Sequence, residues 1–127
     1  MPDEKNSVSI RNLLTNPPGE LEGELFEPLF ETPHFRLERI VSRQHATPPG
    51  RWYDQPWDEW VLLLSGSASL RFEKPDAIVE LRPGDSLLIP AGRRHRVDWT
   101  DPGEDTHWLA LHVRARSPHS SETGSGE

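Results

Sequence analysis

The sequence of 127 residues contains no cysteine. This absence excludes disulfide bridges, thiolate metal sites and a cysteine nucleophile. An excess of positive charge is also lacking, because 14 lysine and arginine residues stand against 21 acidic residues, for a formal net charge of −7. Binding to nucleic acid needs a positive field that attracts the phosphates, so we expect no nucleic-acid partner.

Long hydrophobic runs are absent as well. The longest, residues 60–64, is far shorter than the roughly 18 residues of a membrane span. Residues 1–5 are polar and acidic and do not resemble a secretory signal. We therefore expect no membrane partner and a cytoplasmic protein. Neither a nucleophile elbow nor a phosphate-binding loop is present, which argues against serine hydrolases and P-loop enzymes.

Hydrophobic residues make up only 33% of the chain, partly because both ends are polar. We expect a flexible N-terminal segment at 1–19, one β-barrel domain at 20–115 and a disordered tail at 116–127. The tail is rich in serine, glycine and glutamate, a composition that does not bury a core. The central domain is long enough for one hydrophobic core.

Short segments of strand-like pattern, separated by turn residues, fill the central domain. We expect an irregular or edge strand within 20–31, and a turn of helix or a short edge strand at 9–14. About eight short strands and no core helix indicate an all-β sandwich or barrel. The strands are expected at 34–43, 51–55, 59–64, 67–72, 77–81, 86–89, 95–99 and 106–113.

The stretch 82–95 places one histidine at a defined point. Pro83-Gly84 fits the two central positions of a type II turn, because proline presets its φ angle and glycine accepts a positive one. A short apolar run follows, and residues 90–92 turn the chain again. These turns fix His95 at the start of the next strand, where it serves binding or chemistry or simply occupies a hairpin corner.

The same stretch is similar to the second conserved motif of the cupin superfamily. Gly84, five residues, Pro90-Ala91-Gly92, two residues and His95 follow that motif, and Trp99 stands where the family has asparagine. Glu59, followed after six residues by Gly66, matches the second half of the first cupin motif. The chain thus resembles a small single-domain bacterial cupin over residues 34–113. The resemblance implies a cupin-type double-stranded β-helix, or jelly-roll barrel.

The resemblance also implies a site in the barrel mouth. In metal-bearing cupins two histidines and a glutamate of the first motif and a histidine of the second hold a divalent cation. Glu59 and His95 occupy two of these four positions, and the His-x-His pair is missing. Two registers are open for the missing pair, Tyr53 with Gln55 or Trp52 with Asp54.

Ligand chemistry limits what such a site could hold. With Asp54 or Gln55 beside Glu59 and His95, the oxygen-rich set would suit Mn²⁺, Fe²⁺ or Zn²⁺. The alternative is a wet pocket without metal, in which Glu59 and His95 bond to each other or to Arg93.

Further residues are candidates for the wall of a ligand pocket. His45 precedes the first-motif loop and either supplies a missing imidazole or is an exposed loop histidine. His107 is expected to face inward, and His112 outward, if Leu109 and Leu111 share the inner face. Arg93 either binds an anionic group or forms a surface ion pair. The complete set of expected wall residues is Trp52, Tyr53, Trp99, Arg93, His107 and His45.

Three functions follow from these features. The first is a non-haem metal enzyme that activates a substrate oxygen or O₂. The second is a metal-poor module that binds a small polar ligand and acts as a sensor or accessory protein. The third is an interaction protein that works through a dimer surface, since the resemblance implies a homodimer. A fold alone does not choose among them, and no catalytic residue is assigned.

Overall fold

The structure, a computed structural model of the chain, describes residues 8–15 and 23–114. The expected tail 116–127 and most of the expected segment 1–19 lie outside the described residues. Within them the chain forms strands and no helix, which confirms the all-β prediction. No helix long and apolar enough to cross a membrane occurs in these two ranges.

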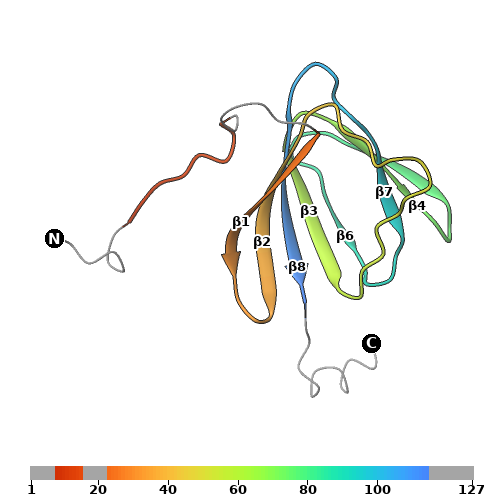
Figure 1. The fold of residues 1–127 in the computed structure, drawn as a ribbon, viewed down its shortest axis with the longest axis horizontal. Helices are drawn as coiled ribbons and strands as arrows, with labels where there is room; N and C mark the ends of the chain where they lie inside the picture. The colour runs from red at the N-terminus through yellow and green to blue at the C-terminus, as the bar shows by residue number, and fades with distance from the viewer. Residues whose placement is uncertain (1–7, 16–22, 115–127) are drawn as a thin grey trace.

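Eight strands follow one another along the chain (Figure 1). The edge strand expected within 20–31 is present as β1, and the other strands fall close to their expected positions. Their bounds are β1 Glu24–Glu31, β2 Phe35–Ser42, β3 Asp58–Ser65, β4 Ala68–Phe72, β5 Ala77–Leu81, β6 Ser86–Ile89, β7 His95–Thr100 and β8 Thr106–Val113.

The strands form two antiparallel sheets. The larger has the order β1-β2-β8-β3-β6, and the smaller has the order β5-β4-β7. Figure 1 shows the larger sheet on one side of the barrel and β4 and β7 on the other. Strand β8 pairs with both β2 and β3, so the C-terminal strand lies in the middle of the larger sheet.

The expected strand at 51–55 is a loop in the structure. Only Tyr53 forms a bridge, to His95, through two backbone hydrogen bonds of 2.7 and 3.1 Å. Pro56 has no N–H to donate and prevents the pairing from continuing. The loop therefore runs beside the start of β7 and joins neither sheet as a strand.

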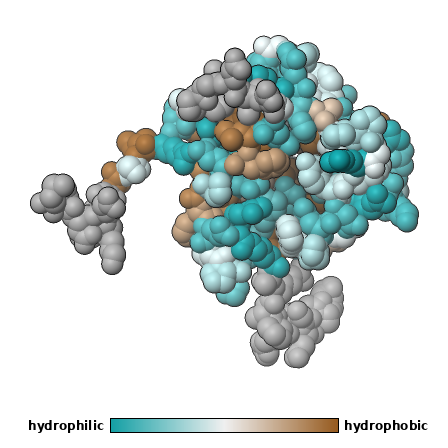
Figure 2. All heavy atoms as spheres, in the orientation of Figure 1, coloured by the Kyte–Doolittle hydropathy of each residue, from teal (hydrophilic) through white to brown (hydrophobic). Residues whose placement is uncertain are grey.

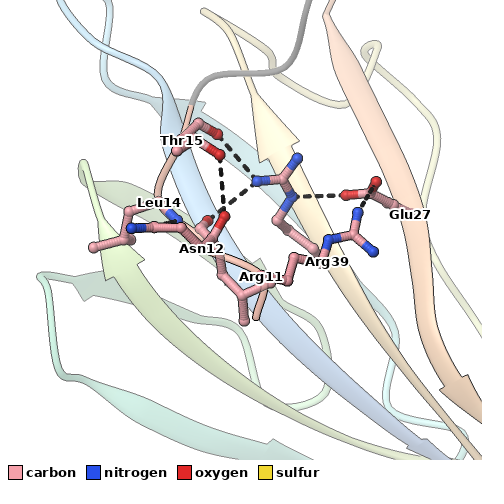
Figure 3. A network of polar contacts seen from close by, with 7 residues as sticks. Arg11, Asn12, Leu14, Thr15, Glu27 and Arg39 are labelled. Atoms are coloured by element: carbon pink, nitrogen blue, oxygen red, sulfur yellow. Dashed lines mark hydrogen bonds and ion pairs between the residues drawn. The ribbon is translucent and has the colours of Figure 1, made fainter. Parts of the chain in front are cut away.

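Residues 9–14 likewise form neither the helical turn nor the strand expected there. They end in a turn that Arg39 holds on the outer face of the larger sheet (Figure 3). Arg39 is only 5% exposed, and its guanidinium donates to the carbonyl oxygens of Leu13 (3.3 Å) and Thr15 (3.0 Å) and to Glu27 (2.9 Å). These acceptors satisfy a charge that would be unfavourable to bury alone.

The hydrophobic core lies between the two sheets. Leu63, Leu70 and Trp108 are between 0 and 4% exposed and belong to β3, β4 and β8. Burial of such side chains contributes about 1.5–3 kcal/mol each. Because side chains alternate along a strand, β3 turns Trp60, Leu62 and Leu64 to the outer face, so the larger sheet is apolar on both sides.

Candidate functional site

A cavity of about 330 Å³ lies between the two sheets and is lined mainly by apolar side chains. Its apolar lining comprises Phe26, Pro28, Ile40, Val61, Leu70, Ile89, Val97 and Trp108. Polar and aromatic groups line the rest: Glu24, Arg36, Glu38, Tyr53, Gln55, Trp57, Glu59, His95 and His112. An apolar cavity with a few polar groups is the usual form of a small-molecule site.

Two turns of the 82–95 stretch position His95. The turn predicted at Pro83-Gly84 is present, because the Asp85 N–H donates to the Arg82 carbonyl (2.9 Å) and Gly84 has a φ of +95°. The Gly84 N–H then donates to the carbonyl of Leu63 on β3 (2.8 Å), which ties the turn to the larger sheet. A second turn at residues 90–93 leads directly to His95.

The loop between residues 53 and 58 is fastened to that second turn. The Gly92 N–H donates to the Gln55 carbonyl (2.8 Å), and the Ala91 N–H donates to the Asp58 carboxylate (2.9 Å). Together with the Tyr53–His95 bridge, these bonds fix the backbone on both sides of Gln55. The side chains of Tyr53 and Gln55 are therefore held at the cavity.

One end of the polar lining, which we term the Glu59 end, consists of Glu59, His95 and Gln55. Glu59 is 8% exposed and His95 is 6% exposed. Nδ1 of His95 lies 3.0 Å from the carbonyl oxygen of Arg93. That oxygen only accepts, so the hydrogen-bond network assigns the proton of the neutral ring to Nδ1 and leaves Nε2 as an acceptor.

The Nε2 acceptor of His95 faces Glu59. The distance from Nε2 to Oε1 of Glu59 is 3.9 Å, beyond hydrogen-bonding range. Gln55 donates its amide to the same Oε1 (2.7 Å), and the Tyr53 ring stacks on His95 with 5.5 Å between centroids. With the neutral ring in this tautomer, the Glu59 end presents two facing acceptors.

The opposite end, termed the Glu38 end, consists of Glu38, His112, Trp57 and Arg36. The Trp57 indole donates to Nδ1 of His112 (2.9 Å), so Nε2 carries the proton of the neutral ring and donates to Glu38 (3.2 Å). Arg36 forms an ion pair with the other oxygen of Glu38 (3.3 Å). The carboxylate and both imidazole nitrogens at this end therefore have partners within the protein.

The electrostatic field in the cavity is set by three carboxylates and one guanidinium. Burial raises the pKa of the Glu24 carboxyl, and the charges of Glu38 and Glu59 add to this, whereas His45 and Ser42 act in the opposite direction. Burial also raises the pKa of the Tyr53 hydroxyl, followed by the charges of Glu24 and Glu59. Both pKa values are raised in part by the same negative field.

The sequence and the fold both match those of known proteins. The family model of the cupin domain matches residues 43–120. The chain belongs to the cupin family. A candidate mannose-6-phosphate isomerase from Ralstonia eutropha JMP134 has 48% sequence identity with this cupin and a TM-score of 0.79, covering 85% of this chain and 100% of that one. A search of curated proteins found no match.

More distant structures share the fold of this cupin. The polyketide cyclase RemF from Streptomyces resistomycificus has 25% identity and a TM-score of 0.62, covering 76% of this chain and 69% of its own. The Fe(II) form of HppE has 12% identity and a TM-score of 0.62, covering 72% of this chain and 50% of its own. The latter likeness extends to the fold alone, although that protein carries a metal.

The residues present in this cupin do not fit a metal centre with three protein ligands. Across residues 8–15 and 23–114, no group of three or more histidine, aspartate or glutamate side chains could hold a metal ion. Glu59 and His95 supply two donors, and catalytic metal sites usually have three. Gln55 turns its amide hydrogens toward Glu59, whereas Asp54 is exposed and does not line the cavity.

Several residues expected at the pocket wall lie elsewhere. Trp52 packs under the guanidinium groups of Arg94 and Arg96, at 5.4 and 5.9 Å, and not in the cavity. Arg93 donates to the carbonyl oxygens of residues 73 and 75 and therefore fastens a turn. Trp99 does not line the cavity and is 46% exposed. Of the expected wall residues, only Tyr53 lines the cavity.

The two histidines of β8 face opposite to the expectation. His112 lines the cavity with Trp108, whereas His107 is buried on the outer face beside Arg39. The expectation depends on Leu109 and Leu111 facing inward because they are apolar. That reasoning fails because the outer face of the larger sheet is also apolar.

His45 lies behind the cavity wall. Its Nε2 is 3.2 Å from the carboxylate of Glu24, which does line the cavity. His45 therefore contacts the site through Glu24 and not directly. The polar cavity residues that sequence reasoning missed are Glu24, Arg36, Glu38 and His112. Arg36 and Glu38 lie in the segment 34–43, where the alternation of charged and apolar residues is the available signal.

Proposed function

We propose that this cupin binds a small, largely apolar molecule in the barrel cavity, through the Glu59 end and without a metal. One observation carries the proposal: the buried His95 presents Nε2 to the cavity, and no described residue hydrogen-bonds to it. A ligand that donates a hydrogen bond to this acceptor within the largely apolar cavity gains free energy. The apolar walls bind the remainder of the molecule.

The same pair supports proton transfer. Nε2 of His95 can accept a proton from a bound molecule, and the carboxylate of Glu59, 3.9 Å away, stabilises the imidazolium that forms. The backbone bridge to Tyr53 and the carbonyl of Arg93 keep the ring in place. Binding and acid–base chemistry therefore use the same two side chains.

A phosphorylated sugar is disfavoured as the ligand, although the 48% identical relative is a candidate mannose-6-phosphate isomerase. Phosphate binding uses several cationic groups or backbone N–H donors. Among the described residues, the cavity is lined by three glutamates and one arginine, Arg36, which is already paired with Glu38. The charge of this cavity supports a neutral or cationic ligand.

A fragment screen by NMR on the ¹⁵N-labelled protein tests the proposed function. We expect hits to shift the amide resonances of Tyr53, Gln55 and His95. The variant Val97→Phe, which enlarges a side chain of the cavity wall, should abolish these shifts while the protein stays folded. If no fragment shifts these resonances, or if binding survives in Val97→Phe, the proposal is wrong.

A divalent metal held by Glu59 and His95 is the second candidate, because both residues match the family motifs. Elemental analysis of protein purified without a histidine tag tests it. We expect less than about a tenth of an equivalent of Mn, Fe or Zn after reconstitution, since two firm ligands bind weakly. A stoichiometric metal that is lost in Glu59→Gln would establish the metal site instead.

We also propose that two copies of this chain pair. Val8 and Ile10 are 93 and 97% exposed on the N-terminal segment that projects from the barrel in Figures 1 and 2. The outer face of the larger sheet carries Trp60 and Leu62. One chain thus supplies both an apolar arm and an apolar face, which a two-fold dimer covers together. We expect Ile10→Asp to weaken the dimer. Sedimentation that shows a monomer at tens of micromolar would contradict the pairing.

A further inference from the structure

The Glu59 end has a chemistry that selects one class of ligand. We infer that the cavity takes a protonated primary amine on an apolar body, with the ammonium group between His95 and Glu59. This inference rests on the proposed function, because it names the ligand class for the same cavity.

The first step concerns hydrogen-bond donors. Nε2 of His95 and Oε1 of Glu59 are both acceptors and lie 3.9 Å apart. A nitrogen about 2.8 Å from each would bond to both. A hydroxyl group has a single hydrogen and satisfies one acceptor, whereas an ammonium group has three and satisfies both. Among the described residues only Gln55 donates to this carboxylate, and its hydrogen bond is directed at Oε1 alone.

The second step concerns charge. Glu38 is paired with Arg36 and His112, and Glu24 lies beside His45. Glu59, by contrast, has the neutral amide of Gln55 and, at 3.9 Å, Nε2 of His95 as its neighbours. A carboxylate that is 8% exposed and has no lysine or arginine partner among the described residues is unfavourable. A bound ammonium group would supply the missing charge.

The negative field extends beyond Glu59 itself. The charge of Glu59 contributes to the raised pKa of both Glu24 and Tyr53, which lie on other parts of the cavity lining. An alkylamine remains protonated at neutral pH, as a lysine side chain does with its pKa near 10.4. A cation entering this cavity therefore moves toward a field that already exists.

The third step concerns the walls. Phe26, Tyr53, Trp57 and Trp108 place aromatic rings around the cavity. Such rings attract organic cations through their faces and also accept an apolar body. The Glu38 end has no open carboxylate or imidazole, so the ligand needs one charged group and not two. A carboxylate or phosphate on the ligand would meet three glutamates instead.

Calorimetry with matched probes tests the inference. The probes are 2-phenylethylamine, 2-phenylethanol and phenylacetate, and the corresponding trio with a cyclohexyl body. These trios keep the apolar body fixed and change only the polar group. We expect each amine to bind at least about tenfold more tightly than its alcohol, and the carboxylates not to bind, because charge-assisted hydrogen bonds are the stronger ones.

Variants locate the effect. Glu59→Gln should reduce amine binding to about the level of the alcohol, because it removes the negative charge that pairs with the ammonium group. Glu80→Gln, an exposed carboxylate on β5, is the matched control and should leave amine binding unchanged. If Glu59→Gln does not fold, Gln55→Glu provides the opposite change, and it should raise the preference for the amine.

The outcomes separate this inference from the proposed function. If cavity hits appear in the fragment screen but alcohols or carboxylates bind as well as amines, the inference is wrong and the proposed function stands. If no probe of either trio and no fragment binds in the cavity, both are wrong. An amine preference that persists in Glu59→Gln would also overturn the inference.

Discussion

Gly66, which follows the last residue of β3, offers a test of how closely the turn between β3 and β4 packs against β8. Its φ is +88°, and a Cβ built there would lie 2.4 Å from Oγ1 and 2.7 Å from Cα of Thr106, a residue with no exposed surface. The positive φ costs an alanine about 1–2 kcal/mol. The overlap adds about 1–3 kcal/mol, because a backbone atom has to move.

We therefore expect Gly66→Ala to lower the free energy of unfolding by about 2–5 kcal/mol, a large part of the 5–15 kcal/mol typical of a domain. Gly84→Ala is the matched control, since Gly84 has a φ of +95° but nothing within 4 Å of its Cβ position. Gly84→Ala should lose only the about 1–2 kcal/mol that the positive φ costs an alanine. Urea unfolding followed by tryptophan fluorescence measures both values.

The comparison isolates the steric part. If Gly66→Ala loses no more stability than Gly84→Ala, the close approach of Thr106 is not limiting and the reasoning is refuted. Truncating Thr106 shows how much of the loss comes from overlap with its side chain and how much from overlap with its backbone. Thr106→Ala removes the 2.4 Å overlap with the hydroxyl oxygen but leaves the overlap with the backbone of residue 106, so it should restore only part of the loss in the double variant.

Two further predictions concern buried polar groups. Trp57→Phe removes the indole that donates to His112 and leaves Nδ1 of that buried ring without its hydrogen bond, so we expect the free energy of unfolding to fall by about 1–3 kcal/mol. Trp99→Phe, at a half-exposed site, is the control and should change the urea midpoint little. Equal losses in the two variants would contradict the prediction. Burial, followed by the charge of Arg39, lowers the pKa of His107 from 6.5. The unfolded chain then binds more protons below about pH 6.5, so stability falls as the pH falls through this range. The urea midpoint, measured at pH 7.5, 6.5 and 5.5, should depend less on pH in His107→Gln than in the natural sequence. An unchanged dependence on pH would exclude His107 as the cause.

The sequence predicts those parts of the structure that depend on local backbone chemistry. Pro83-Gly84 makes the expected turn because proline and glycine restrict the backbone wherever they occur. The strands from β2 to β8 follow from alternation and turn residues. The strand prediction at 51–55 is wrong because the aromatic residues there have high strand propensity, whereas tertiary pairing leaves only Tyr53 bridged.

The direction in which each side chain points is harder to predict. Alternation assigns His107 and His112 to opposite faces, but it does not say which face is inside. Here the outer face is apolar and the inner face contains Glu38, Glu59 and two histidines, so hydrophobicity indicates the wrong side. The polar lining of this cavity is an exception to the ordinary rule that polar residues face water.

The segment that replaces the His-x-His pair explains why Glu59 and His95 remain together without a third metal ligand. Tyr53 and Gln55 line the cavity at the place where that pair is expected, and each contacts one of the two retained residues. Tyr53 stacks on His95, and Gln55 donates to Glu59. A neutral ring and a neutral amide orient the acceptors but supply no positive charge. The substitution therefore leaves Glu59 with no lysine or arginine beside it among the described residues, and the proposed ammonium group would supply that positive charge.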